Sequence, residues 1–480
     1  MNRATRMETP YRDRPERPGL RRALVPLLAS LALVAASRPA PLRTTAEIEK
    51  ILARGPHAGE CEQCHVMHGA ETSLPELHAL VGPDDNSLCD RCHTSPWTTG
   101  SYAGTWIYAG SSHGSSPNAA WPGPSPPART ELGAAGKCVN CHDAHGWQDG
   151  QGDIPGLAVA REEQLCLACH SGSPASTNVG ADYVKAFRHP TTTISGIHTG
   201  PEESSPTDFG AAPANRRHAE CVDCHNPHVA THDPSTPPPD DNLSRVNYGV
   251  SRVRVTNGGA GSPPTFTFVA ASDTLSPPLA EYELCFKCHS SWTVQPSGQT
   301  DLAAALNPSN PSYHPVESVG RDPSIRIGAF APGWGPTSLT RCGSCHGSDF
   351  GTTEGPHGSS YRYILRASYA ASTAPRTMTS DEICFTCHAY DVYANPTSSA
   401  ATLTQSRFNE PGDAKGHARH VGEENVPCYG CHVTHGSSTL PHLLVTGRIP
   451  GIAAYTETPT GGTCQPTCHG SESYSVNYAR

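Results

Sequence analysis

All twenty cysteines of this 480-residue chain fall into ten close pairs, and a histidine directly follows the second cysteine of every pair. Only 26 residues are histidine, so chance does not explain ten such placements. Two thiols at this spacing can form thioether bonds to the two vinyl groups of one porphyrin, while the adjoining histidine binds the iron from the proximal side. Zinc ribbons, redox dithiols and disulfides also use paired cysteines but require no histidine at that position.

The ten signatures therefore predict ten covalently attached haem c groups. Nine read Cys-x-x-Cys-His, and the tenth, Cys464 to His469, has one extra residue between its cysteines. An attachment system that rejects this spacing would leave nine haems. The predicted thioether residues are Cys61, Cys64, Cys89, Cys92, Cys138, Cys141, Cys166, Cys169, Cys221, Cys224, Cys285, Cys288, Cys342, Cys345, Cys384, Cys387, Cys428, Cys431, Cys464 and Cys468. The predicted proximal iron ligands are His65, His93, His142, His170, His225, His289, His346, His388, His432 and His469.

Residues 1–37 are typical of a secretory signal peptide. Seven arginines between Arg3 and Arg22 precede an apolar run from Ala23 to Ala36, and small residues at its end provide a cleavage site. The run has 14 residues, whereas a membrane-spanning helix needs about 20. We therefore expect export to the periplasm or the cell surface, and no transmembrane segment after signal removal.

The composition is acidic and rich in turn-forming residues. The chain has 34 basic and 44 acidic residues, and removing the seven basic and three acidic residues of the first 36 leaves 27 against 41. This balance argues against nucleic acid as a partner. Glycine and proline number 45 and 46 of 480 residues, roughly 19% against the usual 12% or so. Many turns and few long helices are the expected result.

The signatures alternate between two kinds and predict five di-haem modules. In the first kind the first cysteine mostly follows a charged residue, such as Lys137 or Arg341. In the second kind it follows a leucine or isoleucine, such as Leu284 or Ile383, which favours a short amphipathic helical turn that packs its aliphatic side chain on a porphyrin. Pairing the two kinds in order gives modules at residues 57–93, 113–170, 189–289, 314–388 and 417–469.

Four signatures of the first kind share a second histidine three residues after the attachment histidine, as in CVNCHDAHG with His145 and CYGCHVTHG with His435. The fourth module instead has His357, eleven residues after His346. These strings resemble the doubled-CXXCH family of multihaem cytochromes, whose unit reads roughly C-x-x-C-H-x-P-H-G, a leucine-rich spacer and L-C-x-x-C-H. The resemblance implies a repeated di-haem unit with electron transfer as its usual role.

Histidine must also supply most distal ligands, because only two methionines remain after signal removal. Without the methionine ligand that raises haem potentials, low potentials are expected. Each module has one histidine just after its first signature and at least one upstream of it, which gives ten distal ligands for ten irons. The predicted distal ligands are His57, His68, His113, His145, His189, His228, His314, His357, His420 and His435. His218 competes with His189, and His417 with His420, whereas His78, His198, His232 and His442 are expected to bind no iron.

The expected fold is a mostly irregular, elongated multihaem cytochrome fold organised by its haems, with short helices at the signatures and few short strands. One insertion looks like ordinary β structure. Residues 252–257 and 265–269 alternate around an Asn-Gly-Gly turn, which predicts a hairpin inside the third module, covering haem edges.

Closely packed haems favour electron conduction in periplasmic or extracellular respiration, with redox proteins or extracellular electron acceptors as partners. This interpretation makes the chain an electron carrier and not an enzyme. One alternative is a multihaem oxidoreductase acting on nitrite, hydroxylamine or a sulfur compound, which would need an iron with an open axial position. The chain has no Cys-x-x-Cys-Lys variant, and only the irregular site at Cys464 could hold such an iron. A second alternative is self-association of the chain into a cytochrome filament.

Overall fold

The computed structural model describes most of the chain from the first signature onward. The described residues are 61, 64–65, 80–81, 86–93, 105–116, 138–149, 152–154, 158–192, 218–232, 244–271, 280–293, 295, 298–322, 325–349, 353–370, 382–409 and 416–475. All ten signatures have their cysteines and attachment histidines within these ranges. The predicted signal peptide and four histidines, His57, His68, His78 and His198, lie outside them.

The helices are short, and many lie at the signatures, as predicted. In the second kind of signature the helix ends at or just after the first cysteine: α2 (Asn86–Asp90), α5 (Glu162–Leu167), α9 (Glu281–Cys285) and α12 (Glu382–Phe385). In the first kind a single turn begins at that cysteine: η3 (Cys138–Asn140), α8 (Cys221–Cys224), α11 (Cys342–Cys345) and η9 (Cys428–Gly430). Leu284 and Ile383, which precede their cysteines, are buried, so these aliphatic side chains do face the interior.

One hydrogen bond recurs in the nine regular signatures. The backbone N–H of the attachment histidine donates to the carbonyl of the first cysteine at 2.8–3.0 Å. This bond closes one α-helical turn and holds both thiols and the imidazole in one compact loop. The tenth signature is different, because Cys464 lies in strand β10 (Gly461–Pro466).

The strands of the described residues form five small antiparallel sheets. Three are single ladders of two residues per strand: β1 (Gln148–Asp149) with β2 (Gly152–Asp153), β3 (Phe187–Arg188) with β7 (Gly358–Ser359), and β6 (Ser312–Tyr313) with β8 (Gly436–Ser437). The predicted hairpin is confirmed as β4 (Arg252–Thr256) paired with β5 (Thr265–Val269). At the C-terminal end, β10 lies between β9 (Ile452–Thr458) and β11 (Glu472–Ser475).

Short helical segments connect these elements. They are α3 (Thr105–Gly110), α4 (Ser112–Ser115), α6 (Val179–Asp182), η5 (Arg245–Asn247), α10 (Leu302–Leu306), η6 (Ile327–Ala329), η7 (Arg362–Ile364), α13 (Tyr390–Tyr393), α14 (Ala400–Leu403) and the π-helical turn η8 (Ala418–Glu423). None of the helices within the described ranges has the length and hydropathy that a membrane span requires.

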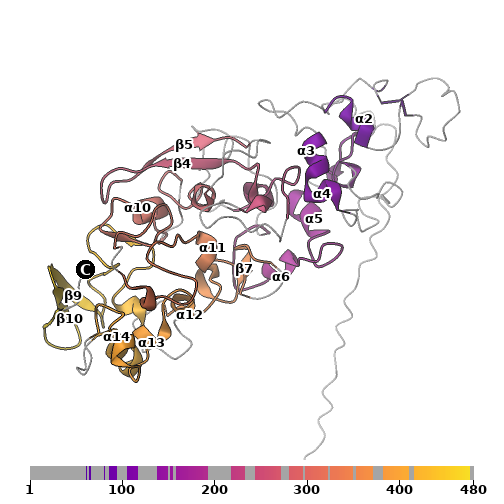
Figure 1. The fold of residues 1–480 in the computed structure, drawn as a ribbon. Coiled ribbons are helices and arrows are strands. Elements are labelled where there is room, and N and C mark those ends of the chain that lie inside the picture. Colours follow the sequence, from indigo (N-terminus) through magenta and orange to yellow (C-terminus); the bar gives the residue numbers. More distant parts are fainter. Residues whose placement is uncertain are drawn as a thin grey trace, which may run out of the picture.

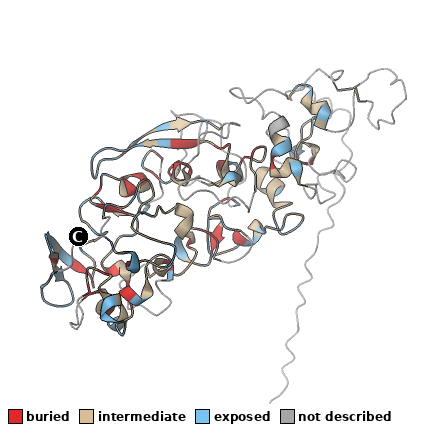
Figure 2. Ribbon diagram, viewed as in Figure 1, coloured by how far each residue is buried: buried red, intermediate tan, exposed pale blue. Residues whose placement is uncertain are grey.

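The apolar core is small for a chain of this length. Val253, Phe286, Ala303 and Leu306 form its main cluster, and the aromatic side chains of β5 pack against it. The hairpin is therefore part of this core. Elsewhere the buried segments are short and scattered along the ribbon (Figure 2). A core this thin agrees with a fold that is organised by cofactors.

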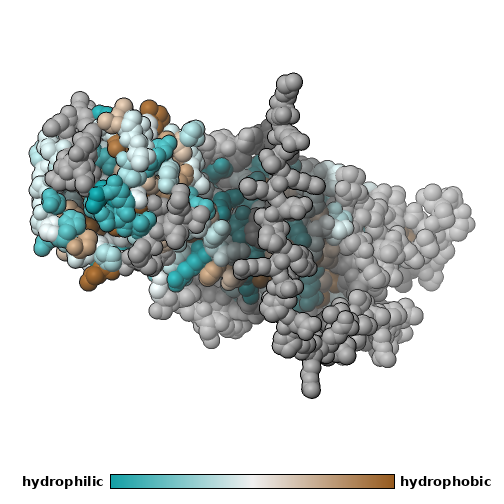
Figure 3. Space-filling model, turned by 90° about the horizontal axis from the view of Figure 1, so that it is seen from below, coloured by the Kyte–Doolittle hydropathy of each residue, from teal (hydrophilic) through white to brown (hydrophobic). Residues whose placement is uncertain are grey.

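The described chain advances along the long axis of an elongated molecule. The signatures near α2 to α5 lie at one end, and β9 and β10 lie at the other (Figure 1). The described surface seen from below is mostly hydrophilic, with small separate hydrophobic patches (Figure 3). The predicted fold class is thus confirmed: it is irregular, with short helices and few short strands.

Candidate haem-binding sites

Nine attachment histidines face a second histidine at nearly constant distance. The ring centroids lie 5.9–6.5 Å apart in the pairs His65–His145, His142–His228, His170–His113, His225–His357, His289–His189, His346–His435, His388–His314, His432–His417 and His469–His420. Two metal–nitrogen bonds of about 2 Å would place imidazole centres about 6 Å apart across one iron. The spacing therefore fits haems with histidine on both axial sides.

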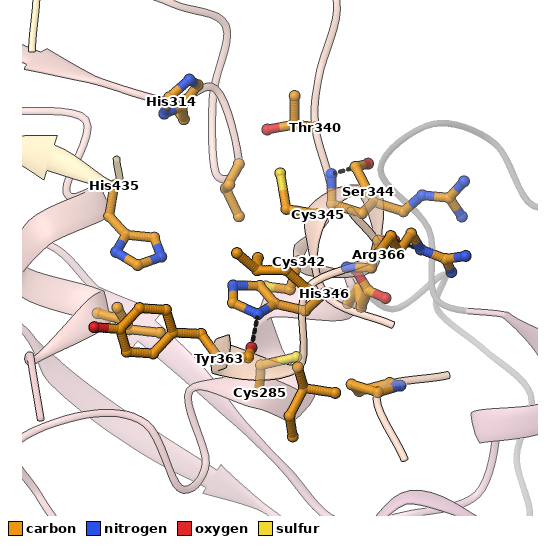
Figure 4. Close-up of a pocket in the computed structure, with 18 of the residues that line it drawn as sticks. Cys285, His314, Thr340, Cys342, Ser344, Cys345, His346, Tyr363, Arg366 and His435 are labelled. Carbon is orange, nitrogen blue, oxygen red and sulfur yellow. Dashed lines mark hydrogen bonds between the residues drawn. The ribbon is translucent and has the colours of Figure 1, made fainter. Parts of the chain in front are cut away.

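The hydrogen bonds of these rings leave the correct nitrogen for iron. Nδ1 of His225 donates to the carbonyl of Val246 at 2.9 Å, and Nδ1 of His346 donates to the carbonyl of Tyr363 at 2.8 Å. Figure 4 shows the second bond, with the rings of His346 and His435 turned toward each other near Cys342. The same Nδ1 contact to a carbonyl recurs at His113, His189, His314, His420, His432 and His469. Each such bond fixes the tautomer and directs Nε2 toward the facing ring.

Two other histidines use the opposite nitrogen. Nε2 of His218 lies 3.2 Å from Oε1 of Glu220, and Nε2 of His442 lies 3.3 Å from Oε1 of Glu457. A ring whose Nε2 contacts a carboxylate does not present that nitrogen to a metal. His189, rather than its competitor His218, faces an attachment ring, that of His289. His417 and His420 both face attachment rings, although the sequence suggested a choice between them.

Burial favours the neutral form of four of the facing rings. Desolvation, reinforced by neighbouring histidines, lowers the pKa of His170, His228, His388 and His435 to about 4. A neutral imidazole has a free lone pair, which is the form that binds a metal.

The thiols of neighbouring modules lie close together. Cys89 contacts Cys138, Cys166 contacts Cys221, and Cys285 contacts Cys342, each as a side-chain hydrogen bond that raises the pKa of the thiol, with burial as the next cause. These contacts join the second signature of one module to the first signature of the next. Porphyrins bonded at such adjacent thiols would come close to one another across the module boundary.

A continuous cavity of about 4340 Å³ runs along the signatures from Cys89 to His469. Ordinary ligand pockets have volumes of about 300–1,000 Å³. The space is thus several times that of a site for one small molecule. It is lined by the cysteines and histidines described above, so the donor set and the room together fit a series of haems.

The facing histidines come from two modules at a time. The second haem site of a module takes the histidine upstream of the first signature in the same module, as in His388 with His314. In the first four modules, the first site takes the histidine that follows the first signature of the next module, as in His346 with His435. At each of three places, which we call junctions, these two distal histidines lie together: His113 with His228, His189 with His357, and His314 with His435.

Backbone bonds hold the junctions. The N–H of His189 donates to the carbonyl of His357 at 3.1 Å, next to the β3–β7 ladder. The N–H of His314 donates to the carbonyl of His435 at 2.8 Å, next to the β6–β8 ladder. At the first junction the described residues form no such ladder, but the N–H of Ser112 donates to the carbonyl of Ala230 at 3.0 Å. This exchange between modules was missed from the sequence, where equal counts per module did not say which iron each histidine faces.

The paired thiols, the adjoining histidines and the facing rings define a c-type cytochrome, in which haem is bound covalently. Residues 132–175, which contain two signatures, match the family model described as the doubled CXXCH motif. The match supports a multihaem c-type cytochrome, with electron transfer as the role that the motif suggests. No curated protein and no solved structure matches the chain.

Proposed function

We propose that the protein conducts electrons through ten bis-histidine haems in periplasmic or extracellular respiration. The observation that carries this proposal is the set of nine facing ring pairs, because iron with two histidine ligands has no open axial position for a substrate. The haem supplies one-electron redox chemistry when bound. The chain supplies the thiols that hold it, the imidazoles that keep its potential low, and a wrapping that sets the distance between neighbours.

The irregular tenth site supports a carrier more than an enzyme. His469 faces His420 with ring centroids 5.9 Å apart, a spacing within the range of the regular sites. The extra residue between Cys464 and Cys468 changes the local element from a helical turn to a strand but leaves the two rings opposite each other. The tenth site is therefore proposed to bind haem with two histidine ligands like the others.

The junction pattern extends to the first module. By that pattern, His145 serves the first site and the upstream His57 serves the second site, at His93. Once His417 and His420 are both used, there are eleven candidates for ten irons. The pattern leaves out His68, because residues 1–56 contain no signature. His57 and His68 lie outside the described residues, and their roles are proposals from the pattern.

The chemistry of haem attachment supports export of the chain. Covalent haem attachment takes place outside the cytoplasm on an unfolded chain, in agreement with the signal-like first 37 residues. Redox proteins or extracellular acceptors are the proposed partners.

Haem count and reactivity test the proposal together. The protein matured in a host competent for cytochrome c assembly is expected to contain ten haems by alkaline pyridine spectrum and intact mass, and to show no turnover of nitrite or hydroxylamine with a reduced dye. A value of nine would remove the site at Cys464 from the set. Steady turnover of either substrate would replace conduction by catalysis.

A further inference from the structure

A buried carboxylate lies beside one of the nine ring pairs. Asp182, the last residue of α6, is only 2% exposed, and its Oδ2 lies 3.9 Å from Nδ1 of His357. The hydroxyl of Ser348 donates to Oδ2 at 2.7 Å, and the hydroxyl of Thr353 also donates to it. Two hydroxyl donors on the oxygen that faces the imidazole fix the position of the charge.

The charge of this carboxylate is only partly balanced. Nζ of Lys185 lies 2.7 Å from Oδ1 of Asp182 and 2.6 Å from Oδ1 of Asp349. All three side chains are at most 9% exposed. Among the described residues, this one cation pairs with both carboxylates, and the three side chains together carry one net negative charge. Charges act more strongly across a protein interior than across water.

This surrounding is unusual among the described distal histidines. Nδ1 of His189 and His113 contacts a neutral backbone carbonyl, whereas Nδ1 of His357 is buried, makes no hydrogen bond within the described ranges and faces Asp182. His145 also lies near a carboxylate, that of Asp143 at 3.5 Å, but its ring is 53% exposed, so water weakens the effect.

We propose that Asp182 is a positioning residue that places a negative charge beside Nδ1 of His357 and lowers the reduction potential of the haem held at Cys221 and Cys224. The inference rests on the proposed ligation of that iron by His225 and His357. An anion beside the distal ligand raises the basicity of the ligand and favours the ferric state, which carries one more positive charge than the ferrous state. The site of Cys221 and Cys224, the fifth along the chain, would then be a low-potential step between the neighbouring sites.

The test is a mediated redox titration of the holoprotein carrying Asp182→Asn. Asparagine keeps the size of the side chain and its capacity to accept from Ser348, but removes the charge. We expect one of the ten one-electron transitions to move upward, with an equilibrium constant about tenfold more favourable for reduction, which is 59 mV for one electron. The His357→Ala variant identifies that transition, because its lost low-spin signal marks this haem.

Asp349→Asn is the matched control. It removes the charge of the second carboxylate that pairs with Lys185 and leaves His357 and Asp182 unchanged. A smaller upward shift of the same transition is therefore expected. Asp349→Asn also provides the answer if Asp182→Asn fails to mature. Unchanged potentials with a retained low-spin spectrum would overturn the role of Asp182 and leave the ligation intact. A high-spin fifth haem in the unaltered protein would instead refute the ligation itself.

Discussion

The middle of the molecule and its C-terminal end complete their iron sites in different ways. At the junction of His314 and His435, the two distal histidines come from consecutive modules and face the rings of His388 and His346. In the last module, His417 and His420 both come from the turn that begins η8, and they face the two attachment rings of the same module. Iron should therefore cross-link modules in the middle, whereas the last module is complete by itself.

The largest difference in stability is expected between the variants His435→Ala and His420→Ala. Each change removes one distal ligand, so each should convert about one haem in ten from low-spin to high-spin. Only His435→Ala also cuts a link between modules, and its loss should destabilise that contact by about 2–4 kcal/mol, the order known for cross-links that close long loops. Limited proteolysis between the fourth and fifth modules, read beside the ferric spectrum, measures both effects. Equal protease resistance of the two variants would show that the junction does not depend on its iron.

The first module provides a second test of this comparison. His57→Ala is expected to produce one high-spin haem, because the pattern assigns His57 to the site at His93. His68→Ala is expected to leave all haems low-spin, because the pattern assigns it to no iron of this chain. Quantified ferric spectra of the two variants measure the number of high-spin haems. A high-spin haem in His68→Ala and none in His57→Ala would mean that the first module does not follow the ligation pattern of the other modules.

These variants also show which features could be predicted from the sequence. The attachment residues, the short helices at the second kind of signature and the hairpin at 252–269 follow from local patterns. The structure contains those helices and that hairpin. The partner of each ring does not follow, because His346 and His435 are brought together by contacts between distant segments. The use of both His417 and His420 was missed for a different reason: counting one upstream histidine per module left no iron for the second.

A smaller effect is expected at the glycine that follows the distal histidine. A Cβ added at Gly436 would lie 1.8 Å from the carbonyl oxygen of Ala305, so the backbones at the junction must separate to admit a side chain. Gly436→Ala should lower the free energy of unfolding by about 1–3 kcal/mol, the usual cost of overpacking. Gly470→Ala is the matched control at the C-terminal end, since a Cβ there meets nothing within 4 Å. Denaturant unfolding compares them, and equal midpoints would show that the close approach is not needed.

The smallest expected effect is the pH dependence of stability that Glu317 contributes, in the segment just after His314. Burial raises the pKa of Glu317 to about 7, and its carboxylate accepts a hydrogen bond from Asn257 at 2.6 Å, which acts in the opposite direction. Because the folded pKa lies above the unfolded one, the protonated form favours folding. That stability is present below about pH 4.5 and is lost as the pH rises toward 7.

Glu317→Gln should therefore be more stable than the unaltered chain at pH 8, by about 1–2 kcal/mol, and equally stable at pH 4. Unfolding midpoints at the two pH values check this. A gain of the same size at both would show that the carboxyl does not titrate in that range.

Quantitative electron paramagnetic resonance of the ferric holoprotein, scaled to its measured haem content, tests the central claim most directly. The facing histidine pairs predict that every haem is low-spin, including the one at Cys464 and Cys468, so the integrated low-spin signal should equal ten irons per chain. A high-spin signal from two or more irons in the resting protein would contradict the account, because the rings would then not be holding iron between them.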